Sequence, residues 1–385
     1  MTIDNEYIKQ LQHELHRIPE LGFELPRTVA VVKRELDKIG IPYTEKYGKS
    51  SIVAEINGEK TFTIALRADM DALPIIEETG VEFASRIEGQ MHACGHDAHT
   101  AILIATVKEL YAMRDKIDCC VRFIFQPSEE CPESGAKMMI ENGVMDGVDV
   151  IVGLHVGGCE SGEIGVHAGP FMAASRPFKI EFFGKSTHAA TPHQGHDALA
   201  AAVRAYTLIK MMMSTELSGL ERYICSIGKL NSGTAQNIIP GYAEMMGTIR
   251  TFNLDIDKFI IGRIRSILES IEREMGVECK IDTDLKSPVV YNDPHTAELV
   301  RAAAEKIVGK DKTVEVEMRL GAEDFAFYGE HAPAMFFRLG THDEAKGFNC
   351  NAHNSNFMLD ESALHLGAET FVQFVIDNMD GKNFK

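Results

Sequence analysis

The first apolar positions of the chain recur at the spacing of a helix. They lie at Ile8, Leu11, Leu15 and Ile18. Residues three and four apart share one face of a helix, and Pro19 ends the periodic segment. A second helix is predicted to begin with Thr28 as its cap and to end at Gly40. The N-terminal region therefore predicts two amphipathic helices.

Beyond Gly40, short apolar runs alternate with helical segments. Strands are predicted at 51–56, 61–66, 121–125 and 148–154, and helices at 101–113 and 134–143. The run 61–66 is apolar enough for a central strand that is buried on both faces. Alternating strands and helices are typical of an α/β domain, in which helices cover a central sheet.

The pattern changes near Gly169. Strands are predicted at 178–183, 223–230, 241–251 and 277–281, with helices at 198–213 and 257–275. The order β-α-β-β-α-β is typical of a small α+β sandwich. From residue 287 the first pattern resumes, with a helix at 294–308, a strand at 334–339 and a helix at 361–378. We therefore expect one domain made of 1–172 and 287–385, and an inserted domain at 173–286.

The length, charge and cysteine content of the chain exclude several classes of protein. A chain of 385 residues exceeds one ordinary hydrophobic core, which favours two domains. The net charge of -18, without any cluster of Lys and Arg, disfavours binding to nucleic acid. The polar N-terminus and the lack of a bilayer-length apolar run predict a cytoplasmic protein without membrane segments. The eight cysteines have no regular spacing, which favours reduced thiols over a disulfide framework.

The segment 91–100, MHACGHDAHT, carries the strongest signal for chemistry. It holds three histidines, one cysteine and one aspartate. In an extended segment side chains alternate, so Cys94 and His96 would point the same way and offer a thiolate and an imidazole to one metal ion. The alternative is a packed cysteine beside solvated histidines. A metal site at this segment therefore needs further ligands from elsewhere in the chain.

Other acidic or imidazole side chains follow the predicted strands. Asp69 and Asp71 come after 61–66, Glu129 and Glu130 after 121–125, and His155 after 148–154. Ligands of open α/β sheets bind at the carboxyl ends of the strands, so these side chains are expected at one edge. Each could instead be structural, as an Asp-rich turn, a surface acid pair or a lone histidine. Together these side chains could bind one or two divalent ions and a reactive water molecule. A neighbouring glutamate could accept and donate the proton of that water, and this combination is typical of amide hydrolysis.

Eight motifs, in order along nearly the whole chain, resemble those of a known family. They are RADMDALPI, HACGHDAH, FQPSEE, GLHV, STHAATPHQGHDAL, NIIPG, GAEDFAFY and AHNSNF. Together they resemble the amidohydrolase branch of the M20 metallopeptidases, which is similar to hippurate hydrolases, N-acyl-amino-acid deacylases and auxin-conjugate hydrolases. The resemblance implies an α/β catalytic domain with a mixed central sheet flanked by helices. It also implies that the inserted domain is an α+β, ferredoxin-like dimerisation domain.

The resemblance implies roles for individual residues as well. The implied metal ligands are Cys94, His96, Glu130, His155 and His353. They would hold two divalent ions per subunit, with Mn²⁺ or Zn²⁺ expected and Co²⁺ or Ni²⁺ as alternatives. Glu129 would be the general base and acid. The residues expected to orient the ligands are Asp69, Asp71 and Asp97.

Further implied roles fall in the inserted domain. His188 matches a histidine that reaches the active site of a neighbouring subunit and stabilises the oxyanion. The resemblance therefore implies a homodimer or a higher oligomer. Asn237, in the NIIPG motif, would bind substrate. Arg250 would hold a substrate carboxylate, because a planar guanidinium suits that group.

The expected function is hydrolysis of the amide bond of an N-acyl amino acid, with an N-acetyl, N-benzoyl or related acyl group. The products would be a carboxylic acid and a free amino acid. A dipeptidase or carboxypeptidase with the same metals is the main alternative. A catalytically silent binding protein is disfavoured, because Glu129 and all five ligand candidates are present. A thiol hydrolase based on Cys94 and His96 is also disfavoured, because a nucleophile and a base two residues apart align poorly.

Overall fold

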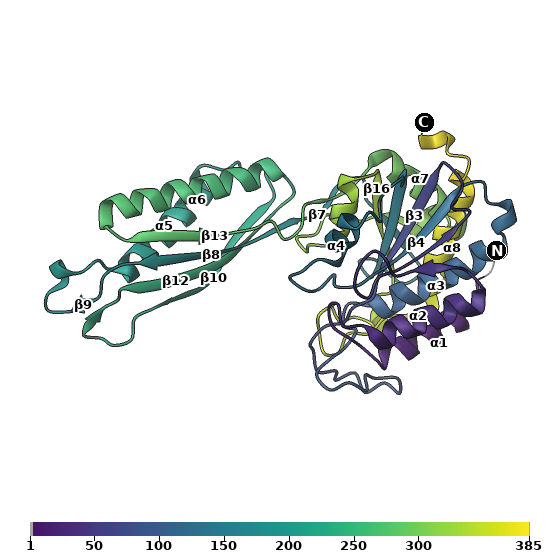
Figure 1. The fold of residues 1–385 in the computed structure, drawn as a ribbon, viewed down its shortest axis with the longest axis horizontal. Helices are drawn as coiled ribbons and strands as arrows, with labels where there is room; N and C mark the ends of the chain where they lie inside the picture. The colour runs from purple at the N-terminus through teal and green to yellow at the C-terminus, as the bar shows by residue number, and fades with distance from the viewer. Residues whose placement is uncertain (1–2, 385) are drawn as a thin grey trace. The chain divides into compact units, whose positions relative to one another are not determined.

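The computed structural model describes residues 3–384, which form two compact units. Unit 1 comprises the described residues of Met1–Phe171, Val290–Met318 and Glu323–Lys385. Unit 2 comprises Met172–Val289 and Arg319–Ala322. Unit 2 is thus inserted into the sequence of unit 1, and each unit is a sheet with helices packed on it (Figure 1).

Unit 1 is built on an eight-stranded mixed sheet in the order β1-β2-β4-β3-β5-β16-β6-β15. Its strands are β1 Tyr43–Thr44, β2 Ile52–Ile56, β3 Thr63–Asp69, β4 Cys120–Gln126, β5 Val150–Val156, β6 Ile164–Val166, β15 Thr313–Glu315 and β16 Ala334–Leu339. The central strands β4, β3, β5 and β16 are parallel to one another. Every residue of β3, β5 and β16 is buried, as expected for central strands covered on both faces. The mixed sheet expected for this domain is confirmed.

Helices cover the eight-stranded sheet. Unit 1 and its boundary with unit 2 in the sequence also contain a separate two-stranded sheet, in which β7 Gly169–Met172 pairs with β14 Val290–Asn292. The helices of unit 1 are α1 Asn5–His16, α2 Pro26–Ile39, α3 His96–Ala112, α4 Gly135–Glu141, α7 Pro294–Val308 and α8 Leu364–Asn378. Helix α3 is buried on almost every side, because α1, α8 and β3 all pack against it. Within residues 3–384, no helix is both long and apolar enough to cross a membrane.

The start of α2 differs from the sequence prediction. The helix begins at Pro26, and Thr28 lies buried inside it instead of acting as its cap. The Glu20 carboxylate accepts hydrogen bonds from the backbone N–H groups of Arg27 and Thr28, both at 2.9 Å. A carboxylate from the preceding loop therefore satisfies the free N–H groups of the first turn, and no side-chain cap is needed.

Unit 2 is a four-stranded antiparallel sheet in the order β10-β12-β8-β13. Its elements are β8 Ala174–Phe183, β9 Thr187–His188, α5 Ala198–Thr215, β10 Tyr223–Ser232, β11 Ile238–Ile239, β12 Tyr242–Thr251, α6 Leu254–Met275 and β13 Glu278–Asp282. Both helices lie on one face of the sheet and form an apolar core with it (Figure 1). The order of the long elements is the predicted β-α-β-β-α-β.

Candidate metal centre

Three parallel strands of unit 1 bring polar side chains to one edge of the sheet. Strand β3 ends at Asp69, β4 ends three residues before Glu129, and His155 is the penultimate residue of β5. Because β4, β3 and β5 are neighbours and run the same way, their carboxyl ends lie side by side. The sheet topology therefore explains why segments up to 86 residues apart in the sequence meet at this edge.

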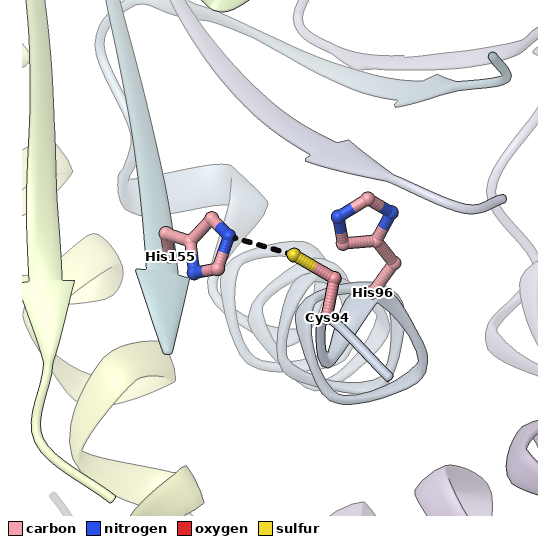
Figure 2. A group of neighbouring side chains, drawn as sticks. All are labelled: Cys94, His96 and His155. Atoms are coloured by element: carbon pink, nitrogen blue, oxygen red, sulfur yellow. Dashed lines mark hydrogen bonds between the residues drawn. The ribbon is translucent and has the colours of Figure 1, made fainter. Parts of the chain in front are cut away.

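Cys94, His96 and His155 form the buried part of the site. Their ligand atoms lie within 4.8 Å of one another, and Cys94 Sγ is 3.3 Å from His155 Nε2. Figure 2 shows Cys94 and His96 at the beginning of α3, with the sulfur directed toward the ring of His155 on β5. One thiol and two imidazoles thus converge on one point.

The local geometry that brings Cys94 and His96 together is not the extended segment predicted from the sequence. His96 is the first residue of α3, and Gly95 caps the helix in the left-handed conformation, with φ of 85°. A Cβ at Gly95 would lie 2.4 Å from Val156 Cγ2, so only glycine fits this turn. A tight glycine turn therefore replaces strand alternation as the cause of the convergence.

A second group shares the sulfur of Cys94. Cys94, Glu130 and His353 also have ligand atoms within 4.8 Å of one another, and Glu130 Oε1 is 3.1 Å from His353 Nε2. His353 has φ of 65°, which is rare for a residue other than glycine, and its N–H donates to the carbonyl of Ala93 at 2.7 Å. This hydrogen bond ties the late loop to the 91–100 segment, so His353 faces the other ligands.

Glu129 and Glu130 are held by Asp71. Their backbone N–H groups donate to Asp71 Oδ1 and Oδ2, at 2.9 and 3.1 Å. Ser128, with φ of 55°, turns the chain between β4 and the two glutamates. The Glu129 carboxylate groups with His96 and Glu130, and also with two further acids, Glu323 and Asp324. Asp71 therefore positions the backbone of the glutamate pair.

Asp69 belongs to a buried network that sequence reasoning missed. Its Oδ1 accepts from His99 Nδ1 at 2.6 Å, and its Oδ2 accepts from Arg67 at 2.7 Å. His99 Nε2 in turn accepts from the N–H of Val156, next to His155. Although burial opposes ionisation, Arg67 with His96 and His99 holds the pKa of Asp69 well below its usual range. Two signals were present in the sequence: an arginine inside an apolar strand, and a histidine three residues after His96.

Asp97 contacts α1 and not a ligand ring. Its Oδ2 accepts from Gln12 Nε2 and lies at the same 2.7 Å from His16 Nδ1. Burial opposes ionisation, but the hydrogen bond from His16 lowers the pKa of Asp97 to about 2. Asp97 therefore anchors the first turn of α3, which begins with His96, to helix α1.

The donor set fits a divalent cation. Both ring nitrogens of His96 are buried without a hydrogen bond, although polar atoms buried in this way ordinarily have partners. Burial and the Glu130 carboxylate raise the pKa of the Cys94 thiol to about 12. A bound cation reverses this, because positive charge stabilises the thiolate. Sulfur, imidazole and carboxylate donors are the ligands of Zn²⁺ and related transition metals.

The remaining predicted residues lie in unit 2. His188, on β9, pairs with Ile238 of β11, and the N–H of Ala189 donates to the carbonyl of Asn237 at 3.0 Å, so His188 and Asn237 lie close together. The side chains of both are exposed. Arg250, on β12, is half-buried, and burial lowers its pKa. Its guanidinium forms no hydrogen bond or ion pair with any residue between 3 and 384.

The fold and the site together define the class of protein. A mixed α/β unit that gathers a thiol, imidazoles and carboxylates at the carboxyl ends of its strands, with a further glutamate beside them, is a metal-dependent hydrolase.

Comparison with known proteins identifies the family. Residues 65–377 match the model of peptidase family M20/M25/M40. Thermostable carboxypeptidase 2 of Saccharolobus solfataricus is 38% identical over 368 residues, covering 94% of this chain and 93% of that protein. The N-acyl-L-amino acid amidohydrolase of Geobacillus stearothermophilus is 38% identical over 334 residues, covering 85% of this chain and 89% of that protein.

A solved structure agrees with these sequence relatives. The crystal structure of the YXEP protein of Bacillus subtilis, a dinuclear metal-binding peptidase of the M20 family, matches with a TM-score of 0.84 and 33% identity, covering 98% of each chain. The present chain belongs to peptidase family M20/M25/M40. It is a metal-dependent amidohydrolase, and the resemblance that the eight motifs indicated is confirmed.

Proposed function

We propose that this protein hydrolyses the amide bond of N-acyl amino acids and releases a carboxylic acid and a free amino acid. One observation carries the proposal. Two groups of candidate metal ligands share Cys94, and the Glu129 carboxylate lies close to one member of each group, His96 and Glu130. The ligands in this proposal are Cys94, His96, Glu130, His155 and His353, which would hold two divalent ions. The N-acyl-L-amino acid amidohydrolase among its relatives supports the substrate class.

The chemistry that such ions supply is Lewis acidity, which activates water as a nucleophile and polarises the amide carbonyl. Glu129 takes the proton of the attacking water as the new C–O bond forms. It then delivers that proton to the amide nitrogen as the C–N bond breaks, so the amine leaves neutral. Burial, with the carboxylates of Glu323 and Glu130 nearby, raises the pKa of Glu129 well above its usual range, which suits a group that must hold a proton between the two steps.

We further propose that residues of unit 2 bind the substrate and complete the site. The guanidinium of Arg250 has no partner among the described residues, which supports a role in holding the substrate carboxylate. The exposure and proximity of His188 and Asn237 support a joint role at the scissile carbonyl. In this proposal the inserted domain, 173–286, pairs two subunits, and His188 acts in the site of the neighbouring subunit.

Carboxypeptidase activity is the second candidate. It would use the same ions and the same Glu129, and the identity of 38% with thermostable carboxypeptidase 2 favours it. The two candidates differ only in whether the acyl group of the substrate is a simple carboxylic acid or an amino acid with its own amino group.

Metal removal and a substrate panel test the proposal. Protein stripped with a chelator and then supplied with Mn²⁺ or Zn²⁺ is assayed on N-acetyl, N-benzoyl and indole-acyl amino acids and on dipeptides. We expect stripped protein to lose activity, and metal to restore release of the amino acid from acyl conjugates. If only dipeptides are cleaved, carboxypeptidase activity replaces N-acyl amino acid hydrolysis as the proposed function. Full activity in the stripped protein would contradict both.

Mixed oligomers test the role of His188. Chains carrying His188→Ala and chains carrying Glu129→Gln should each be inactive alone. Co-expressed, they should recover about a quarter of wild-type activity, because half of the dimers are mixed and each mixed dimer has one complete site. His193→Ala, at an exposed histidine of the same loop, is the control and should stay active alone. No recovery in the mixture would show that His188 does not act across subunits.

A further inference from the structure

His99 contacts two of the proposed metal ligands, but no role proposed above uses it. It is 1% exposed and lies on α3, one helical turn after His96. The centroid of its ring is 5.3 Å from that of His96 and 4.7 Å from that of His155. A buried imidazole in this place is either a further ligand or a group that holds the ligands in position.

The hydrogen bonds of His99 exclude a role as a ligand. Asp69, His96 and His99 do have possible ligand atoms within 4.8 Å of one another. However, the backbone N–H of Val156 donates to His99 Nε2 at 2.9 Å, and Nδ1 lies 2.6 Å from Asp69 Oδ1. Since a backbone N–H group can only donate, Nε2 carries the lone pair and Nδ1 carries the proton. Both ring nitrogens are therefore occupied, and neither is left for a metal ion.

The hydrogen bond to Val156 replaces a missing strand partner. The ladder between β3 and β5 ends at the pair Arg67–Gly153, two residues before His155. The N–H of Val156, which is buried, lies beyond this ladder, and His99 supplies the acceptor that β3 no longer provides. Because buried backbone N–H groups are nearly always paired, the end of β5 depends on His99 for its position.

Val156 in turn determines which nitrogen of His155 faces the other ligands. His155 Nδ1 lies 2.7 Å from the carbonyl oxygen of Val156, which can only accept, so a neutral ring has its proton on Nδ1. The other nitrogen, Nε2, then carries the lone pair, and it lies 3.3 Å from Cys94 Sγ (Figure 2). A neutral imidazole with a fixed tautomer is what binding of a metal ion requires.

We propose that His99 is a positioning residue that holds His155 in the orientation needed to bind a divalent ion. It acts through Val156, and its own ring is held by Asp69, whose second carboxylate oxygen accepts from Arg67. A chain of buried hydrogen bonds therefore connects the arginine on β3 to the proposed ion. The inference rests on the proposed function, because it takes His155 as a metal ligand.

Three substitutions separate the two hydrogen bonds of His99. His99→Phe keeps a ring and removes both nitrogens. His99→Asn places a polar atom near the position of Nδ1, so this side chain can contact Asp69 but not Val156. His99→Gln places its amide oxygen near the position of Nε2, so it can still accept from the N–H of Val156. Thr106→Val is the matched control, because Thr106 is buried in the same helix and its hydroxyl donates to the carbonyl of Ile102, within α3.

Metal affinity is measured on the full-length protein by competition with a chromophoric chelator, using Zn²⁺ and Mn²⁺. We expect the wild type and Thr106→Val to bind two ions per chain. His99→Phe and His99→Asn should bind one of the two ions about 10–100-fold more weakly, and His99→Gln should bind it more tightly than either. Circular dichroism melts verify that each variant is folded. If His99→Phe does not fold, the comparison of His99→Asn with His99→Gln still decides the outcome.

The role of His99 and the metal centre itself can fail separately. Wild-type metal affinity in folded His99→Phe or His99→Asn would overturn the positioning role and leave the metal centre intact. Equal affinity of His99→Asn and His99→Gln would overturn it as well, because the two differ in the contact with Val156. If the wild type bound no divalent ion, the proposed metal centre would be wrong, and the role of His99 would fall with it.

Discussion

Glu129→Gln is expected to lower kcat by about 10³-fold, the middle of the range for loss of a general acid and base. The amide of glutamine is close in size to the carboxylate but cannot accept the proton of the attacking water. The backbone N–H groups of Glu129 and Glu130 would still donate to Asp71, so the glutamate pair keeps its position. The five proposed metal ligands are untouched.

Two measurements together isolate the role of Glu129. Steady-state kinetics give the loss in kcat, and elemental analysis of the purified protein gives the metal content, which should match the wild type. Glu133→Gln is the matched control, because Glu133 is exposed in the same loop, and it should keep full activity. If Glu129→Gln kept more than a tenth of the activity with its metals bound, another residue would have to move the proton.

Arg67→Met is expected to lower the free energy of unfolding by about 3–5 kcal/mol, the cost of leaving buried charges without their partner. Arg67 is fully buried and donates to Asp69 at 2.7 Å, to Asp324 at 2.9 Å and to Glu323 at 3.1 Å. Burial alone would lower the pKa of the guanidinium, but these three carboxylates raise it well above its usual range. Methionine fills a similar volume without a positive charge, so repulsion among the acids remains.

Urea unfolding followed by circular dichroism checks this value. Arg204→Met is the control, because the Arg204–Glu274 ion pair is exposed and an exposed pair contributes only about 0–1 kcal/mol. The difference in the free energy of unfolding between Arg67→Met and the wild type should become smaller at acidic pH. Asp69, whose pKa Arg67 keeps low, stabilises the wild type only while ionised, so this contribution is lost as pH falls. If Arg67→Met lowered the free energy of unfolding by less than about 1 kcal/mol at neutral pH, the three carboxyl groups would have to be protonated in the variant, which would remove their mutual repulsion.

Most elements of the fold were predictable, because hydrophobic periodicity is a local property of the sequence. The predicted helix at 294–308 and strand at 334–339 coincide with α7 and β16. The short strands β6 and β15 were missed, since three residues carry too little hydrophobic pattern to predict a strand. The cap of α2 was wrong, because its N–H groups are satisfied by Glu20, eight residues before Thr28.

By itself, the sequence determined the order of the elements, the family and the residues able to bind metal. These follow from periodicity and from motifs that are contiguous in the chain. Only the tertiary structure decided how the side chains meet. The Gly95 turn places Cys94 beside His96, Arg67 and His99 surround Asp69, and Gln12 meets Asp97 across 85 residues. These arrangements depend on which strands are neighbours in the sheet and on which groups pair with each buried charge. A local sequence pattern encodes neither property.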